Sequence, residues 1–201
     1  MISTLVTVAA LISAAGSVPY ILAVIRGTVR PRLVSWGVWA VLAGVMTVSA
    51  LIEGAMASAV MTTITFIACA MVTVLGWQRR TGGINRGDVI CLVGAILGLA
   101  SLALFKNPLV ALAVSVAVDI IAFIPTLVHA WTSPYEESLT CFALSALGGT
   151  LAVLAVLMGE ISVAALLYPV YSMAFNTVAV LLLLSGRSKL LLGPQYSREE
   201  A

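Results

Sequence analysis

The stretch NPLVALAVSVAVDIIAFIPTLVHA, residues 107–130, is predominantly apolar and holds one acidic residue, Asp119, near its middle. Its length exceeds the roughly 20 apolar residues that a helix needs to cross a bilayer. A carboxyl group in hydrocarbon costs about 2.5–3.5 kcal/mol on insertion scales, so such a residue usually faces a partner, a cavity or a transport path. The stretch therefore predicts a membrane fold and supplies the first candidate functional residue.

The rest of the chain has the same character, with 62% hydrophobic and 9% charged residues and a mean hydropathy of +1.16. Because lipid offers no hydrogen bonds, each spanning backbone must satisfy its own, and this favours helices. We expect an all-α polytopic protein in a lipid bilayer, with seven spans at approximately 3–25, 33–52, 56–77, 88–105, 107–129, 138–158 and 162–185.

The basic residues predict the orientation of these spans. With the N-terminus outside, the cytoplasmic segments hold Arg26, Arg30, Arg32, Arg79, Arg80, Arg86, Arg187, Lys189 and Arg198, and the outer loops hold Lys106 alone. Such an excess follows the positive-inside rule. The N-terminal run lacks a basic start and continues to Ile25, which disfavours a cleaved signal peptide. We expect a multi-pass protein of the bacterial cytoplasmic membrane, with its N-terminus outside and its C-terminus in the cytoplasm.

The loop lengths indicate two repeats. Short loops join spans one to three and spans five to seven, whereas the longer polar stretch WQRRTGGINRGD leads into span four. A shift of 106 residues places Pro19 on Pro125 and the Glu53-Gly54 turn on Gly159-Glu160. The predicted organisation is a first three-helix repeat at 1–80, a linker loop and fourth helix at 81–106, a second, parallel repeat at 107–186 and a cytoplasmic tail at 187–201. Parallel repeats of this 3+1+3 kind place a binding site near the midplane at their interface.

Two segments, SVPYILAVIRGTVRPRLVSWGVWA and VDIIAFIPTLVHAWTSPYEESLTCFAL, resemble the corresponding halves of bacterial PQ-loop and SWEET-like membrane proteins. In the PQ-loop group a Pro-Gln pair marks the first helix of each repeat, and these places read Pro19-Tyr20 and Pro125-Thr126 here. SWEET sugar transporters also contact sugar through an asparagine on the third helix of each repeat. Asn176 fits that place in the second repeat, while its counterpart falls near Cys69 and Ala70.

The candidate substrate-binding residues are Asp119, Asn176, Tyr171 and Trp39. A carboxyl group desolvated among Tyr168, Tyr171 and Asn176 would take up a proton readily, which suggests proton coupling or solute binding. The alternative for Asp119 and Asn176 is a hydrogen bond that only fixes helix packing. The tyrosines would line an outer vestibule or belong to an interfacial aromatic belt.

Pro19 and Pro125 are candidate hinges, because each removes a backbone hydrogen bond at an equivalent place in the two repeats. The first-repeat loop carries Arg30 and Arg32, and its counterpart carries Glu136 and Glu137. These four residues are a candidate cytoplasmic gate. Exposed pairs of this kind contribute only about 0–1 kcal/mol each, so topology-setting arginines beside a solvated acidic loop are the competing interpretation.

Other functional classes find little support in the sequence. It shows no nucleotide loop, nucleophile motif or cofactor fingerprint, so we expect no cofactor and no enzyme activity. His129 has no clustered ligands for a metal, the three cysteines lack CxxC spacing, and the net charge of +2 gives no basic patch for nucleic acid. Gly94 and Gly98 form a small-xxx-small face that would suit a homo-oligomer contact.

The expected function is a SWEET-like transporter, either a facilitator or proton-coupled, for a small polar solute such as a sugar or metabolite. The alternative is a non-transporting receptor or scaffold of the PQ-loop architecture. A cavity continuous to alternate sides would favour transport, and a fully packed centre would favour the scaffold.

Overall fold

The computed structural model describes residues 2–27, 33–78, 107–135, 137–159 and 161–196, together with the separate residues Val89, Leu92, Val93, Ile96, Leu97, Ala100 and Leu104. Every element with bounds in these ranges is an α-helix: α1 Ile2–Arg26, α2 Leu33–Ile52, α3 Met56–Gln78, α5 Pro108–Thr132, α6 Leu139–Leu157 and α7 Val163–Tyr196. The separate residues between 89 and 104 also have helical backbone.

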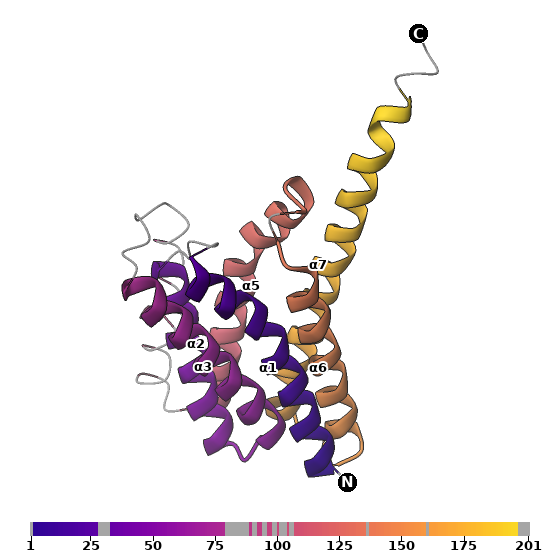
Figure 1. Cartoon of the computed structure of the whole chain (residues 1–201). Helices are drawn as coiled ribbons and strands as arrows, with labels where there is room; N and C mark the ends of the chain where they lie inside the picture. The colour runs from indigo at the N-terminus through magenta and orange to yellow at the C-terminus, as the bar shows by residue number, and fades with distance from the viewer. Residues whose placement is uncertain are drawn as a thin grey trace.

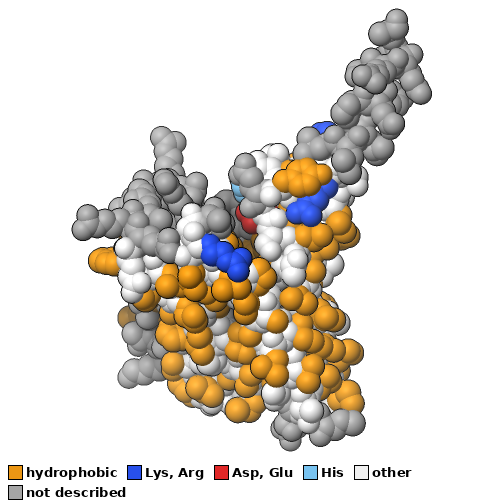
Figure 2. Space-filling model, in the orientation of Figure 1, with side chains coloured by type: hydrophobic (Ala, Val, Ile, Leu, Met, Phe, Trp, Pro, Cys, Tyr) orange, Lys and Arg blue, Asp and Glu red, His pale blue; other side chains and the backbone are white. Residues whose placement is uncertain are grey.

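The helices are suited to a membrane. Within the described ranges, five helices are long and apolar enough to cross one, and α2 contributes a shorter apolar helix at Trp36–Ile52. Large apolar side chains are exposed along their outer faces, for example Leu11, Phe66 and Leu154. Figure 2 shows this flank as largely hydrophobic, with the Lys and Arg side chains gathered towards one end. The described part of the chain is all-helical, and its apolar helices are consistent with a multi-pass protein in a lipid bilayer.

Local sequence fixes where the helices begin and end. The Asn107 side chain caps α5 by accepting a hydrogen bond from the Val110 backbone N–H at 3.2 Å, and Pro108 follows at a position where its missing N–H costs nothing. Ser138 caps α6 in the same way through the Cys141 N–H. The α2–α3 turn depends on Gly54, whose φ of +68° is a conformation that glycine adopts without a Cβ penalty.

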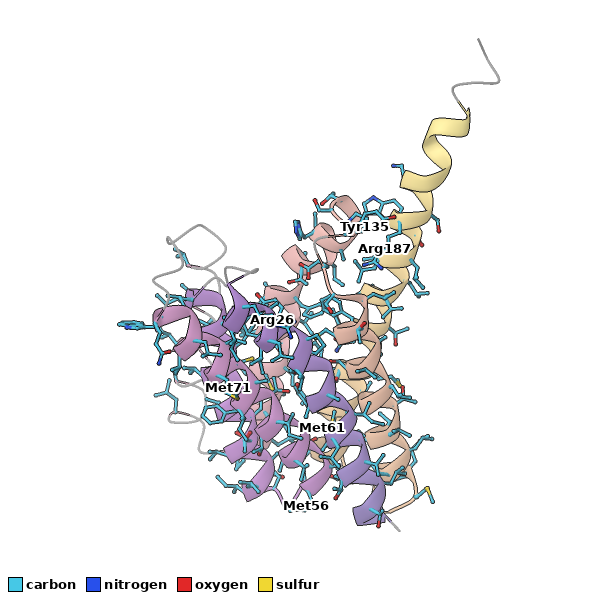
Figure 3. All side chains as sticks on the ribbon, viewed as in Figure 1. Arg26, Met56, Met61, Met71, Tyr135 and Arg187 are labelled. Atoms are coloured by element: carbon cyan, nitrogen blue, oxygen red, sulfur yellow. The ribbon has the colours of Figure 1, made fainter. Side chains whose placement is uncertain are left out.

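Two contacts define the ends of the bundle. Ser58, in the first turn of α3, contacts the backbone of Ala164 and Ala165 in the first turn of α7. Arg187, late in α7, contacts the loop that follows α5. We call these the Glu53 end, after the α2–α3 turn, and the Arg187 end. Figure 1 shows α7 running past the other helices at the Arg187 end, where Figure 3 also places Arg26 and Tyr135, whereas Met56 lies at the opposite end.

The helices pack in a regular order. In the first half of the chain α3 packs against both α1 and α2, and in the second half α7 packs against both α5 and α6. Between the halves, α1 packs on α6, α2 packs on α5, and α3 packs on α7. The third helix of each group of three is therefore the central one, and the groups meet through corresponding pairs.

Small residues allow this close packing. A Cβ added to Gly148 of α6 would overlap the Ser13 Oγ atom and lie 2.7 Å from the Ala9 carbonyl oxygen on α1. A Cβ added to Gly149 would meet the Met173 backbone nitrogen on α7 at 2.6 Å. Adjacent glycines thus let α6 approach α1 and α7 at once, as small residues do in membrane bundles.

Several expectations lie outside the described residues. These are the bounds of the fourth span at 88–105, the contact through Gly94 and Gly98, the arginine-rich loop at 79–86, the gate residues Arg30, Arg32 and Glu136, and the side chain of Pro125. One difference concerns α7, which continues as a helix to Tyr196, past the expected end of its span at 185.

Candidate functional site between the two groups of helices

Asp119 lies near the middle of α5, and its carboxylate accepts a hydrogen bond from the Tyr171 hydroxyl on α7. Its side chain is partly buried, and Cys69 of α3 and Tyr168 of α7 lie within electrostatic range. The structure therefore brings together two of the predicted binding residues, Asp119 and Tyr171. They lie where α5 and the central helices α3 and α7 converge.

A second hydrogen bond continues this polar centre. The Tyr168 hydroxyl and Thr65 Oγ1 are 2.7 Å apart and join α7 to α3. The rings of Tyr168 and Tyr171 lie 5.8 Å apart, so the two hydrogen-bonded pairs are neighbours. Both tyrosines are more than nine-tenths buried. They therefore line the interior of the described bundle and do not form an interfacial belt on its surface.

Pro169 lies in α7 between Tyr168 and Tyr171 and is fully buried. Because proline has no N–H, the Ala165 carbonyl four residues earlier loses its normal helical donor. Ser58 Oγ lies 2.9 Å from this carbonyl oxygen and 2.7 Å from that of Ala164, so its single O–H is shared between the two carbonyls and partly replaces the missing donor from α3. A membrane interior requires such compensation, because lipid cannot provide it.

Aromatic rings fill the Arg187 side of this centre. Phe123 of α5 packs edge-on against Phe142 of α6, with ring centroids 5.9 Å apart, and against Phe175 of α7 at 6.1 Å. Tyr171 joins the group through Phe175 at 5.2 Å. These rings lie between Asp119 and the start of α6, so the surroundings of the carboxylate are apolar on the side towards the Arg187 end.

Trp39, the predicted binding residue on α2, belongs to a neighbouring aromatic group. Its ring packs edge-on against Trp36 at 5.4 Å, and Trp36 contacts Tyr20 of α1 at 4.8 Å. The Trp39 Nε1 atom is buried and has no hydrogen-bond partner among the described residues. An indole N–H in this condition is a donor that a ligand or water can satisfy.

Asn176 lies on a different face of α7 from Tyr171, about 140° further round, because each residue of an α-helix turns about 100°. Its amide nitrogen donates to the Ser172 carbonyl at 2.7 Å, within its own helix. The amide oxygen remains available as an acceptor in the described structure. The structure thus does not bring Asn176 into the Asp119–Tyr171 pair.

The predicted hinge and gate residues lie elsewhere. Pro19 is inside α1 with an exposed ring, and Pro125 is inside α5. Glu137 lies in the α5–α6 loop, where its backbone carbonyl accepts a hydrogen bond from Arg187 at 3.3 Å. Glu137 is also within electrostatic range of Tyr20. It is the gate residue that the structure describes.

The sequence did not single out Ser58, Thr65 or Phe123. A signal for the first two was present, since Ser58, Thr62 and Thr65 follow a helical spacing that puts three hydroxyls on one face of α3. No family model, curated protein or solved structure matches this chain.

Proposed function

We propose that this chain is a SWEET-like membrane transporter for a small polar solute such as a sugar or metabolite. The observation that carries the proposal is the pairing of helices. A central third helix in each half, with α1 on α6 and α2 on α5, is the arrangement expected of two parallel repeats related by a pseudo-two-fold axis. Asp119, Tyr171 and Tyr168 lie at the interface between the proposed repeats, where such transporters bind their solutes.

The proposal includes a seven-helix, 3+1+3 organisation. α3 ends at the Arg187 end and α5 begins at the Glu53 end, so the connecting chain has to cross the bundle. The helical backbone and the exposed apolar side chains of Val89, Leu92, Val93 and Ile96 support a linker helix there. Parallel repeats need such an odd crossing between them.

The orientation proposed for the bacterial cytoplasmic membrane puts the Arg187 end in the cytoplasm. Arg26, Arg187 and Lys189 support it, because all three lie near that end (Figure 3). Single cysteines introduced at Glu53 and in the 79–86 loop test it by labelling from outside intact cells. Labelling at Glu53 alone is expected, and labelling of the 79–86 loop alone would reverse the orientation.

The proposed mechanism uses Asp119 as a group that gains and loses a proton as the solute binds. Its only hydrogen bond in the described structure comes from a neutral hydroxyl, so protonation breaks no ion pair. The carboxyl group is placed to exchange this bond for one to a solute hydroxyl or amine. Whether the solute moves alone or with the proton decides between a facilitator and a coupled transporter.

The receptor or scaffold of the PQ-loop architecture remains the second candidate. Its support is the pairing of polar groups in the centre, since Thr65 with Tyr168 and Tyr171 with Asp119 satisfy one another. A centre that only holds helices together has this property.

Uptake into proteoliposomes separates the two functions. A thermal-shift screen first identifies which small metabolites stabilise the purified protein, because a ligand that binds the folded form raises its melting temperature. For a coupled transporter, uptake of that solute should depend on pH, and Asp119→Asn should abolish this dependence while retaining exchange. No stabilising solute and no uptake by the unmodified protein would favour the scaffold.

A further inference from the structure

Two buried serines behave differently from several threonines of the bundle. The side chains of Thr47, Thr63, Thr73 and Thr150 all donate to the carbonyl four residues earlier in their own helices. This local bond is open to any serine or threonine in a helix. The hydroxyls of Ser49 and Ser115 are fully buried yet have no hydrogen-bond partner among the described residues.

Under the proposed repeat, Ser115 and Asp119 are assigned to the side of α5 between α2 and α7, where α7 holds the Tyr171 partner of Asp119. Ser115 is one turn before Asp119 and therefore shares its face. The 106-residue shift aligns Ser115 with Ala9 and Asp119 with Ser13, the two α1 residues that abut Gly148 of α6. Since α5 packs on α2 as α1 packs on α6, the proposed repeat predicts that the aligned residues face α2.

The α1–α6 and α2–α5 interfaces also differ where α1 and α6 touch. Gly148, which lets α1 and α6 touch, aligns with Leu42 of α2. A leucine side chain holds two helices further apart than a glycine does, because the distance between helix axes depends on the side chains at the contact. Accordingly, α2 and α5 share a smaller contact than α1 and α6. We call the smaller of the two interfaces the α2–α5 seam and assign to it, from helical spacing and the repeat alignment, Trp39, Leu42 and Ser49 with Ser115 and Asp119.

The polar atoms of this seam extend from Asp119 towards the Glu53 end. Trp39, Leu42, Met46 and Ser49 recur at helical spacing and form one inward face of α2. Ser49 is near the end of α2, beside the Glu53 turn, and Ser115 is one turn from Asp119 in the same direction. In the opposite direction lie the rings of Phe123, Phe142 and Phe175.

We propose that the α2–α5 seam is a hydrated route by which water reaches Asp119 from the Glu53 end in the conformation described here. Ser49 and Ser115 provide hydroxyls for the water molecules along it, because buried polar groups without protein partners are normally satisfied in this way. The inference deepens the proposed function, since it gives the side from which a proton or solute hydroxyl meets Asp119. By the same inference, the α1–α6 interface, which is closely packed through Gly148, contains no water and corresponds to the α2–α5 seam in the other half of the bundle.

Cysteine accessibility tests the route without requiring transport. Ser49→Cys and Ser115→Cys are made singly in a background where Cys69, Cys91 and Cys141 are replaced by alanine. Their matched controls are Ala155→Cys and Ala9→Cys, which the same shift aligns with them and which are also 0% exposed. A cysteine differs little from a serine in size, and unfolding curves confirm that each variant is folded.

Each variant in nanodiscs, where both faces meet solvent, is treated with 2-aminoethyl methanethiosulfonate and, separately, with silver ion, which is small enough to follow water. Thiols react as thiolates, which form in water and not in a dry interface. We expect at least one of the two reagents to modify the serine-derived cysteines about tenfold faster or more than the alanine-derived ones. Equal rates in the four variants with both reagents would overturn the proposal, whether the rates are high or negligible. The labelling assay needs no solute, so it is independent of the uptake assay. Fast labelling of the seam cysteines without any solute uptake would refute the transport function and leave the hydrated route standing. Solute uptake without labelling of the seam cysteines would refute the hydrated route and leave the transport function standing.

Discussion

Ser58 on α3 provides the hydrogen bond that Pro169 removes from α7. The proline leaves the Ala165 carbonyl without its helical donor, and the Ser58 hydroxyl lies 2.9 Å from that oxygen. Although the two residues are far apart in sequence, together they allow α7 to lack one backbone hydrogen bond and still be buried at its contact with α3. With this support from Ser58, α7 continues as a helix across Pro169, and Tyr168 and Tyr171 face the interior.

Ser58→Ala should therefore destabilise the protein by about 1–3 kcal/mol, the cost of a buried acceptor left unpaired. Pro169→Ala restores the backbone donor, so in that background the serine change should cost markedly less. Unfolding followed by tryptophan fluorescence in detergent measures both differences. Thr63→Ala is the control, because its hydroxyl bonds only within its own helix, to the Ala59 carbonyl. Equal costs for Ser58→Ala with and without Pro169 would show that the two residues act independently.

Tyr171→Phe and Tyr168→Phe separate ligand chemistry from packing. The first removes the hydroxyl that donates to Asp119, and the second removes the one paired with Thr65. We expect Tyr171→Phe to weaken binding of the stabilising solute about tenfold, the effect of about 1.4 kcal/mol, with little change in stability. Tyr168→Phe should instead lower stability by about 0.6 kcal/mol, the average for hydrogen bonds between membrane helices, with affinity unchanged. Isothermal titration and unfolding curves on both variants check this, and the reverse pattern would place the ligand at Tyr168.

The positions of the helices follow from the sequence, but their contacts do not. The expected span 33–52 coincides with α2, because bilayer thickness fixes a helix's length and the Glu53-Gly54 turn ends it. Its buried face is harder to predict. Leu42 is 0% exposed and Leu51 is 53% exposed, although both are leucines, because lipid and protein core favour the same side chains.

The same reason limits prediction of the site. Asp119 stands out as an acidic residue in an apolar run, and its cost in lipid makes a partner necessary. Thr65 and Ser58 do not stand out, because most hydroxyls in these helices are satisfied by their own backbone and only the fold shows which ones reach a neighbouring helix.

Gly148→Ala should destabilise the bundle more than a glycine change elsewhere. Its new Cβ would overlap Ser13 and press on the Ala9 carbonyl, and overpacking of this kind costs about 1–3 kcal/mol. Gly44→Ala on α2 is the matched control, since its Cβ would lie 3.5 Å from the Phe66 ring, an ordinary contact. Unfolding curves should show a clear loss for the first and little or none for the second. Equal stability of the two variants would mean that α1 and α6 separate easily.

Arg187 fixes the α5–α6 loop to α7, and its removal should free that loop. Its Nε donates to the Pro134 carbonyl at 3.0 Å, and its guanidinium lies 5.2 Å from the centre of the Tyr135 ring. With its further bond to the Glu137 carbonyl, one side chain makes three contacts to a single short loop.

Arg187→Lys keeps the charge but loses the planar fork, so it should behave nearly as Arg187→Ala does. In both variants, hydrogen exchange of the amides of Ser133, Tyr135, Glu137 and Ser138 should accelerate about tenfold, as expected for a loss of about 1.4 kcal/mol in opening free energy. Lys189→Ala is the control, because Lys189 contacts the Trp131 ring at 5.6 Å and not the loop. Mass spectrometry of peptides covering the loop gives the rates. An unchanged exchange rate in Arg187→Ala would show that the loop is held by its own turn and by the Ser138 cap. An exchange rate in Arg187→Lys as slow as in the unmodified protein would show that the positive charge alone is sufficient.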